Sequence, residues 1–424
     1  MVKKYYNAKL LLENGIQDGC LVVKDNQIVF IGQDYVGADE EYDVKGNILM
    51  PTFKNAHAHS PMTFLRSNAD DMPLQEWLKK QIFPYEAKLT EDDVYFLTKL
   101  AILEYLSSGI GAVSDMYFIN KPIAKACNEY GFRNSILNGI VKSDINKGIL
   151  KILDDEKAYI ESLGEFVKYN VGIHAEYSNS LESLKEVSKY IHEHKLPIFA
   201  HMSETKKEVE DCIKRYNKTP VELFNELGLF DFGGTVYHMV YPKDNDLKIL
   251  KERNINVVTC PASNLKLASG IANIKKMLDL GINVAIGTDG PASNNSLDMF
   301  KEMYLAYALQ KVLLNQAQAI EAKDVLKMAL CNGAKAMGLE KLDGLKVGNY
   351  ADFIEVDLNM PNMQPKNNII NNLVYSCGKQ NIKMTVINGK ELYKDGKYFI
   401  KDSQEEIYKK ANQIALRIKE EVNG

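Results

Sequence analysis

The first chemistry that the sequence suggests comes from histidine, of which the chain has only seven among 424 residues. His57 and His59 are separated by a single alanine at the end of an apolar run typical of a β-strand. In an extended chain the side chains of residues i and i+2 point to the same side, so both imidazoles can face one site. This spacing favours chelation of a metal ion, although the pair alone also occurs in proteins without metal.

Three further candidates follow short apolar runs later in the chain, and these are His201, His238 and Asp289. Any one of them is more simply explained as a hydrogen-bonded structural residue. Together, three imidazoles and one carboxylate make a borderline-soft ligand set that suits Zn²⁺. We therefore predict that His57, His59, His201 and Asp289 bind one divalent metal ion.

The other histidines divide into one candidate for the site and two for the surface. His174 ends another apolar run, at a place where a lysine would be needed to bridge a second metal ion, and so favours one metal ion over two. By itself it is more often a structural residue than a functional one. His192 and His194 lie in a segment rich in lysine and glutamate, so we expect them to be solvated.

Acid–base chemistry near the metal would come from carboxylates. Glu204 lies three residues after His201, where the chain leaves the strand, so its carboxylate can face a substrate while His201 faces the metal. Its alternative role is that of an acid at a helix N-terminus, which the helix dipole favours. Asp289 has the alternative role of a cap in the turn 288–291. Proximity to the metal favours catalysis for both residues.

These residues must be positioned by strands, and eight apolar runs separated by stretches with helical periodicity supply them. The expected strands are Ile48–His57, Gly111–Tyr117, Ser135–Val141, Asn170–Ala175, Pro197–His201, Thr235–His238, Asn256–Cys260 and Asn283–Gly287. Eight alternating units predict an α/β fold, a (β/α)8 TIM-type barrel. Five of the seven histidines fall at the C-terminal ends of strands, the face on which barrel enzymes build their active sites.

Short β-type runs with turn residues between them occupy both ends of the chain. They predict a small flanking β-sandwich domain built from residues 1–50 plus 348–424, beside a catalytic barrel over residues 51–347. A helix follows Ser403, which begins a capping box with Glu406. Its apolar stripe, which includes Ile407, Ile414 and Ile418, is expected to pack on the body of the protein.

Composition excludes several classes of function. The 52 basic and 56 acidic residues give a net charge of −4, which argues against a protein that binds nucleic acid through clustered positive charge. No apolar run reaches the roughly 18 residues that a membrane span needs, and the first residues do not resemble a secretory signal. We expect a soluble cytoplasmic protein with a small-molecule substrate, no membrane or nucleic-acid partner, and possible homo-oligomers.

Longer strings around the candidate ligands resemble the amidohydrolase superfamily. They are NAHAHSPMTFLRSNADDMPLQEW at 55–77, HMSE at 201–204, PASNLKLASG at 261–270 and GTDGPASNNSLDM at 287–299. Within the superfamily they are most similar to the 5'-methylthioadenosine/S-adenosylhomocysteine deaminase branch. The resemblance extends over essentially the whole chain, including the return to β structure after Val347.

The resemblance implies roles for individual residues. His57, His59, His201 and Asp289 would hold a catalytic Zn²⁺, or Fe²⁺ as in some relatives, and His238 would contact the attacking water. Residues implied to bind a nucleoside are Glu86 at the ribose hydroxyls, Glu204 at the purine ring, and His174, with Trp77 and Met62 as an apolar wall. The implied reaction is hydrolytic deamination, in which Asp289 takes a proton from water and Glu204 protonates the purine ring.

Two positions depart from the family pattern. Tyr241 stands where relatives often carry a second histidine after the sixth strand. The loop 142–148 contains Lys147 but no arginine, and a lysine lacks the planar fork that binds a carboxylate through two hydrogen bonds. The homocysteine tail is therefore a poorer fit than a smaller nucleoside.

Alternatives to an adenine-nucleoside deaminase are another amidohydrolase, such as a guanine or cytosine deaminase or a triazine-type hydrolase, and a metal-binding homologue without turnover.

Overall fold

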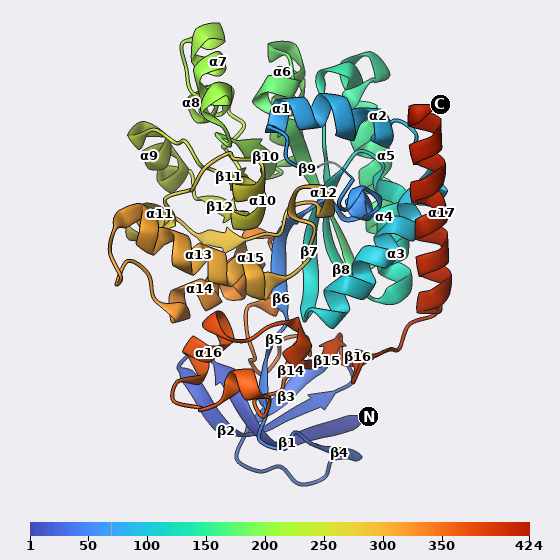
Figure 1. Cartoon of the computed structure of the whole chain (residues 1–424), viewed down its shortest axis with the longest axis vertical. Coiled ribbons are helices and arrows are strands. Elements are labelled where there is room, and N and C mark those ends of the chain that lie inside the picture. The colour runs from blue at the N-terminus through green and yellow to red at the C-terminus, as the bar shows by residue number, and fades with distance from the viewer. Residues whose placement is uncertain (69) are drawn as a thin grey trace.

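The computed structural model describes residues 1–68 and 70–424 and consists of a barrel of eight parallel strands above a separate mixed sheet (Figure 1). The barrel strands follow one another in chain order. They are β6 (Phe53–Ala58), β7 (Ile110–Tyr117), β8 (Arg133–Asn138), β9 (Val167–Ala175), β10 (Ile198–Met202), β11 (Gly234–His238), β12 (Ile255–Thr259) and β13 (Val284–Ile286). The prediction of an eight-stranded α/β barrel is confirmed.

One predicted strand is wrong in its extent. The run Ile48–His57 is divided at Thr52 into β5 (Ile48–Pro51), which belongs to the mixed sheet, and β6, which begins the barrel. The run is mostly apolar and both halves are buried throughout, so no exposed residue marks the break. Parallel strands covered on both faces give this continuous pattern, as in β7, where all eight residues are buried.

Helices surround most of the barrel, and α16 lies below it beside the mixed sheet (Figure 1). In order, the helices of the described chain are α1 (Leu74–Trp77), α2 (Phe83–Glu86), α3 (Glu91–Ser107), α4 (Asn120–Tyr130), α5 (Ile149–Ser162), α6 (Leu181–His194), α7 (Lys206–Tyr216), α8 (Pro220–Glu226), α9 (Asp244–Glu252), α10 (Pro261–Lys266), α11 (Ile274–Asp279), α12 (Pro291–Asn294), α13 (Met299–Leu314), α14 (Ala322–Ala329), α15 (Cys331–Ala336), α16 (Ile369–Tyr375) and α17 (Gln404–Asn423). A π-helical turn, Leu78–Ile82, joins α1 to α2. The capping box that begins α3 has Thr90 Oγ1 accepting the Asp93 N–H at 3.2 Å.

The first and last barrel strands meet through side chains. In the described chain β6 and β13 share no ladder, but Asn55 Oδ1 accepts the Thr288 N–H at 2.8 Å and Asn55 Nδ2 donates to Thr288 Oγ1 at 2.7 Å. The Asp289 N–H also donates to the His57 carbonyl at 2.9 Å. A side chain at Gly287 would place its Cβ 2.7 Å from the His57 Cβ, so only glycine allows this approach.

The mixed sheet contains nine strands from both ends of the chain. They are β1 (Val2–Leu12), β2 (Gly15–Lys24), β3 (Gln27–Gly32), β4 (Glu40–Asp43), β5, β14 (Phe353–Val356), β15 (Ile382–Ile387), β16 (Lys390–Lys394) and β17 (Lys397–Tyr398). β5 joins the two contributions, because it pairs with β1 on one side and β14 on the other. The flanking β structure is thus confirmed. The division into 1–50 plus 348–424 and 51–347 stays a prediction, since Met50 and Ile354 share one core with the barrel.

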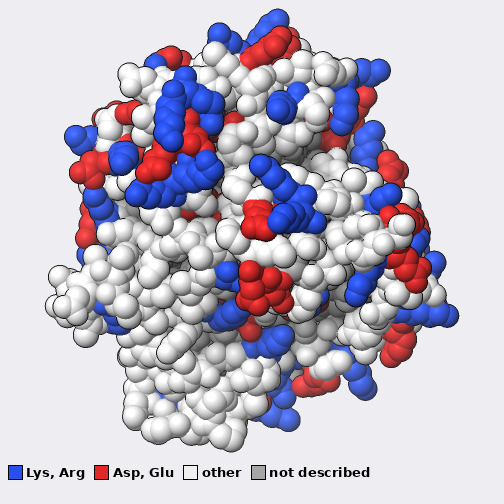
Figure 2. Space-filling view, turned by 45° about the horizontal axis from the view of Figure 1, so that its top comes forward, with Lys and Arg blue, Asp and Glu red and all other residues white. Residues whose placement is uncertain are grey.

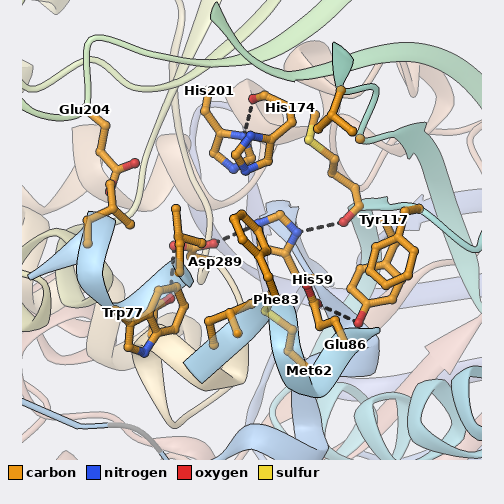
Figure 3. A pocket seen from close by; sticks show the side chains of 18 of the residues that line it. His59, Met62, Trp77, Phe83, Glu86, Tyr117, His174, His201, Glu204 and Asp289 are labelled. Atoms are coloured by element: carbon orange, nitrogen blue, oxygen red, sulfur yellow. Dashed lines mark hydrogen bonds and ion pairs between the residues drawn. The ribbon is translucent and has the colours of Figure 1, made fainter. Parts of the chain in front are cut away.

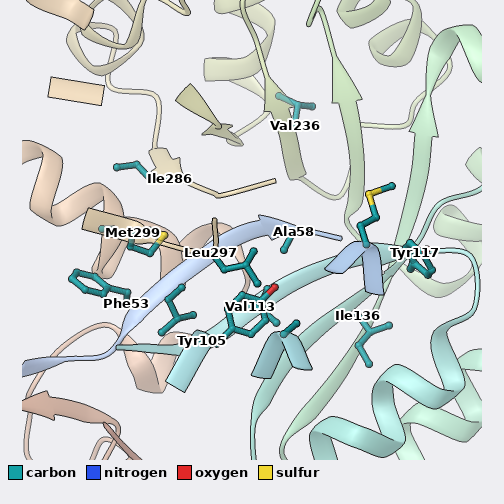
Figure 4. Packing of buried hydrophobic residues seen from close by; sticks show 14 of the residues in the cluster. Phe53, Ala58, Tyr105, Val113, Tyr117, Ile136, Val236, Ile286, Leu297 and Met299 are labelled. Atoms are coloured by element: carbon teal, nitrogen blue, oxygen red, sulfur yellow. The ribbon is translucent and has the colours of Figure 1, made fainter. Parts of the chain in front are cut away.

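Helix α17 lies beside α3 on the outside of the barrel (Figure 1). Its side chains Ile407, Ala411, Ile414 and Ile418 are buried, and Arg417 Nη2 lies 2.5 Å from Asp93 Oδ2. Buried side chains from many elements form one hydrophobic core, which includes Phe53, Val113, Ile136 and Ile286 (Figure 4).

Charged side chains of both signs are distributed over the face of the molecule in view. Figure 2 shows basic and acidic side chains as neighbours, with neither kind forming a continuous patch. Among the described residues no helix is both long and apolar enough to cross a membrane.

Candidate active site

The structure brings the predicted metal ligands together at the C-terminal mouth of the barrel. His57 Nε2 lies 3.1 Å from His201 Nε2 and 3.5 Å from Asp289 Oδ1, and His59 Nε2 lies 3.1 Å from the same oxygen. His238 joins this group, since ligand atoms of His57, His201, His238 and Asp289 all lie within 4.8 Å of one another. Four barrel strands, β6, β10, β11 and β13, therefore converge on one centre.

The imidazole rings are oriented by hydrogen bonds on their outer nitrogens. Nδ1 of His59 donates to the Met116 carbonyl at 2.7 Å, and Nδ1 of His201 donates to the His174 carbonyl at 2.6 Å. A carbonyl only accepts, so in both rings Nδ1 carries a proton, and Nε2, whose lone pair is available when the ring is neutral, faces the centre. A hydrogen-bond acceptor on the ring nitrogen that does not face the metal fixes the tautomer of a metal-binding histidine. These lone pairs, together with a carboxylate, form a donor set that fits a divalent cation.

His238 is oriented in the same way by a side chain. Its Nδ1 donates to Asn264 Oδ1 at 2.8 Å. The ring of His57 instead stacks on Tyr237, with ring centroids 3.8 Å apart, and its buried Nδ1 has no partner in the part of the chain that the structure describes. In three of the four rings, an acceptor on Nδ1 thus directs Nε2 toward the centre.

Asp289 is held on both carboxylate oxygens. Its Oδ2 accepts hydroxyl hydrogen bonds from Ser263 at 2.5 Å and Ser293 at 3.0 Å, while Oδ1 accepts the Gly290 N–H at 2.8 Å. Burial raises the pKa of this carboxyl, but hydrogen bonds with His57 and His59 hold it well below its usual range. The carboxylate is therefore ionised and fixed in direction before any substrate arrives.

A repeated tetrapeptide supplies the side chains that hydrogen-bond to Asp289 and His238, and the sequence analysis did not predict these residues. Pro-Ala-Ser-Asn occurs at 261–264, beginning α10, and again at 291–294, forming α12. The serine of each copy donates to Asp289. Glu302 joins the copies, because it accepts the Ala262 N–H at 3.0 Å and the Asn294 amide at 2.7 Å. The repetition after two successive strands is the signal that would have found them.

Charge in the cluster is balanced by a proton on one ring. Burial lowers the pKa of His59, but its hydrogen bond with Asp289 and the charge of that residue raise it to about 9. Burial lowers the pKa of His57 to about 3, so that ring is neutral. A cation bound at the centre would replace the proton on His59, which makes metal binding and proton release linked events.

The backbone at the strand ends adopts left-handed conformations that only tertiary contacts sustain. Ser203, His238, Met239 and Asp289 have φ values of 51°, 72°, 45° and 61°. The Ser203 carbonyl accepts N–H groups from residues 240 and 241 at 3.0 and 2.9 Å, which ties the ends of β10 and β11 together. Such strain is concentrated at functional sites, where the surroundings over-determine it.

The centre opens into a cavity of about 300 Å³ whose walls are mainly apolar. Glu204 and Glu86 lie on opposite sides of the histidine cluster (Figure 3). Glu204 Oε1 accepts a hydrogen bond from Ser269 at 3.1 Å, and its Oε2 lies 3.9 Å from His238 Nε2. Burial raises the pKa of the Glu204 carboxyl, which favours its protonated form.

Glu204 is not the acid that caps the following helix. Thr205 is the N-cap of α7, and Glu208 completes its capping box. The Glu208 carboxylate also accepts the N–H groups of Ser203 and Glu204, both at 2.8 Å, and so fixes the turn that carries Glu204. The Glu204 side chain is left to line the cavity.

The opposite end of the cavity is built around Glu86. Its Oε1 accepts a hydrogen bond from the Tyr117 hydroxyl at 2.8 Å, and burial raises its pKa to about 7. His174 lines the cavity with its ring centroid 5.0 Å from that of His201, and Trp77 and Met62 lie in the wall, as Figure 3 shows.

The remaining sequence predictions fall outside the cavity. His192 and His194 are exposed as expected, and Tyr241 is 36% exposed and is not among the described lining residues. Lys147 lies at the end of a 3-10 turn, with its side chain 66% exposed and its Nζ 3.2 Å from Asp144.

Comparisons with known proteins agree with this architecture. The chain is 40% identical over 395 residues to the 5-methylthioadenosine/S-adenosylhomocysteine deaminase of Caldanaerobacter subterraneus subsp. tengcongensis, covering 91% of each chain. It is 37% identical over 411 residues to the 5'-deoxyadenosine deaminase of Methanosarcina mazei, covering 95% of each. The crystal structure of an adenosine deaminase from Xanthomonas campestris with bound zinc superposes with a TM-score of 0.93 at 28% identity, covering 99% of this chain and 98% of the other.

The model of the amidohydrolase family matches residues 48–392, which include every residue of the site described above. The family resemblance predicted from the strings around His57, His201 and Asp289 is confirmed, and this chain belongs to the amidohydrolase family.

Proposed function

We propose that the protein is a metal-dependent hydrolase that deaminates an adenine-type nucleoside, such as 5'-methylthioadenosine, adenosine or S-adenosylhomocysteine, and releases ammonia. The observation that carries the proposal is one cavity with a histidine–aspartate centre in the middle and a buried glutamate at each end. The relatives named as deaminases of adenine nucleosides support this choice of substrate.

His57, His59, His201 and Asp289 would hold one divalent metal ion, with Zn²⁺ preferred and Fe²⁺ as the alternative. When bound, such an ion supplies a Lewis acid and lowers the pKa of a coordinated water toward about 7. The converging Nε2 lone pairs and the ionised carboxylate support this assignment.

Proton transfer falls to residues around the centre. His238 Nε2 orients the attacking water, because its Nδ1–H is occupied by Asn264. A carboxylate oxygen of Asp289 accepts a proton from that water and later delivers it to the departing ammonia. Glu204 donates a proton to the ring nitrogen beside the reacting carbon, and its burial favours the protonated form that this role needs.

Glu86 binds the ribose hydroxyls at the other end of the cavity. Its carboxylate is held by Tyr117, which leaves the second oxygen for substrate. His174, Trp77 and Met62 contact the nucleoside between the two glutamates. The adenine ring is thereby placed toward Glu204 and the sugar toward Glu86.

Ammonia release from purified, metal-loaded protein tests the proposal. The panel holds 5'-methylthioadenosine, 5'-deoxyadenosine, adenosine, S-adenosylhomocysteine, guanine, cytosine and a chlorotriazine. Turnover of adenine nucleosides with kcat/KM above about 10⁴ M⁻¹s⁻¹ supports it. Turnover of guanine, cytosine or triazine alone would establish another amidohydrolase activity, and no turnover of any compound would favour a metal-binding homologue. Cytoplasmic location and homo-oligomers stay predictions of the sequence.

A further inference from the structure

Glu302 is a buried carboxylate that the proposed mechanism does not use. It lies in the first turn of α13, and its side chain has no exposed surface. It is not among the described residues that line the cavity. Burial of a carboxylate costs free energy unless its oxygens accept hydrogen bonds. The role of Glu302 therefore depends on the groups that its two oxygens hold.

The two oxygens of Glu302 accept hydrogen bonds from two different helices. Oε2 accepts the N–H of Ala262 in α10 at 3.0 Å, and Oε1 accepts the side-chain amide of Asn294 in α12 at 2.7 Å. Both partners are N–H donors, so an acceptor is needed on each side. An ionised carboxylate offers two acceptors, whereas a glutamine would present its own N–H to one of the donors. The residue type therefore suits a group that joins α10 to α12.

Both contacts of Glu302 lie directly beside a serine that holds Asp289. Ala262 precedes Ser263, whose hydroxyl donates to Asp289 Oδ2 at 2.5 Å. Asn294 follows Ser293, whose hydroxyl donates to the same oxygen at 3.0 Å. A shift of α10 relative to α12 would therefore separate the two hydroxyls that converge on this oxygen.

The amide of Asn294 extends the connection to the backbone of the site. Its Nδ2 also donates to the carbonyl of Thr288 at 2.6 Å, directly before Asp289. Its Oδ1 accepts a hydrogen bond from Lys301 Nζ at 2.8 Å. The first turn of α13 thus holds both atoms of this amide, and the amide in turn holds the peptide that carries Asp289.

We propose that Glu302 is a positioning residue for Asp289. By joining α10 to α12, it fixes the spacing of Ser263 and Ser293 and so aims the Asp289 carboxylate at the histidine cluster. Glu302 acts from behind the site and contacts no substrate. The inference rests on the proposed function, because it assumes that Asp289 is one of the metal ligands.

The first test is the zinc affinity of Glu302→Gln, measured by competition with a chelator. The measurement is made at pH 8, above the pKa of about 7 to which burial raises the Glu302 carboxyl. We expect the affinity to fall about fivefold or more, as loss of an outer partner of a metal ligand does. The matched control is Glu321→Gln, which removes an exposed acid that pairs with Lys323 at 2.7 Å and should leave zinc affinity unchanged. Wild-type affinity in Glu302→Gln would overturn the proposal.

A double-mutant cycle then identifies the route by which Glu302 acts. In the Ser263→Ala, Ser293→Ala background the hydroxyls that Glu302 positions are gone, so Glu302→Gln should weaken zinc binding by no more than about twofold further. In the Glu204→Gln background it should keep its full effect. The same fold-loss in both backgrounds would show that Glu302 acts through another route, and would overturn the proposal.

Two further outcomes separate this inference from the deaminase function. Absence of turnover with every nucleoside, together with the expected zinc affinities, would overturn the deaminase function alone, whereas a wild-type protein that does not bind zinc would overturn the metal site and the role of Glu302. If circular dichroism shows that Glu302→Gln does not fold, Asn294→Ala replaces it, because it removes the donor to Oε1 and keeps Glu302. Wild-type zinc affinity in Asn294→Ala would then overturn the proposal.

Discussion

The two ends of the cavity are built in different ways. At the histidine–aspartate centre, four strands supply the groups, and Asp289 alone accepts three hydrogen bonds from Ser263, Ser293 and Gly290. At the end proposed to bind ribose, Glu86 has one hydrogen-bond partner among the described residues, Tyr117, and lies on a short segment of two single-turn helices joined by a π-helical turn. In the proposed mechanism, the groups that perform chemistry are fixed by rigid elements, while the groups that select the substrate lie on a segment that can vary.

Removing a ligand at the rigid end should have the largest effect. His201→Ala is expected to lower kcat/KM by roughly 10³-fold or more, because a divalent ion supplies several kcal/mol of charge stabilisation. Metal content per chain, measured by mass spectrometry of the elements, should fall with activity. His192→Ala is the matched control, since His192 is exposed and pairs with Asp231 at 3.0 Å. Full activity in His201→Ala would remove the metal from the mechanism.

The next effect should come from the proton donor beside the centre. Glu204→Gln keeps the shape of the side chain and is expected to lower kcat by about 10²- to 10⁴-fold, the usual contribution of a general acid. Metal content should stay at the wild-type level. An unchanged kcat would assign the proton transfer to another group.

The hydrogen bonds behind Asp289 should contribute less than the ligands themselves. The double variant Ser263→Ala, Ser293→Ala is expected to weaken metal affinity or activity about 10- to 100-fold, as loss of outer partners of a metal ligand does. Competition with a chelator gives the affinity. Each single variant should show a smaller loss, and a double variant with wild-type affinity would show that the strand geometry alone fixes Asp289.

The smallest effect is expected at the ribose end and should depend on pH. Burial raises the pKa of Glu86 to about 7, so its carboxylate is mostly protonated at pH 6 and mostly ionised at pH 8. Because the ionised form is the stronger acceptor for ribose hydroxyls, KM for adenosine should fall a few-fold as the pH rises through 7. The Glu86→Gln variant should have a higher KM without this pH dependence. If Glu86→Gln keeps the same pH dependence of KM, a group other than Glu86 causes that dependence.

The sequence predicts the barrel and the candidate metal ligands better than the hydrogen bonds that hold these side chains in place. Fully buried parallel strands such as β7 give mainly apolar runs, and candidate ligands at their ends follow from the geometry of the fold. The same signal concealed the break at Thr52. Ser263, Asn264 and Tyr117 belong to residue types common everywhere, and their partners are 26 to 31 residues away, so only the folded chain pairs them.

The mixed sheet has a consequence for the synthesis of the chain on the ribosome. β5 pairs with β14 through Leu49 and Glu355, residues separated by about 300 positions. While the barrel is being translated, the edge of β5 that will receive β14 stays open, and an open strand edge is a template for pairing with another chain. The N-terminal strands thus need the barrel or a chaperone to cover them until the last quarter of the protein emerges.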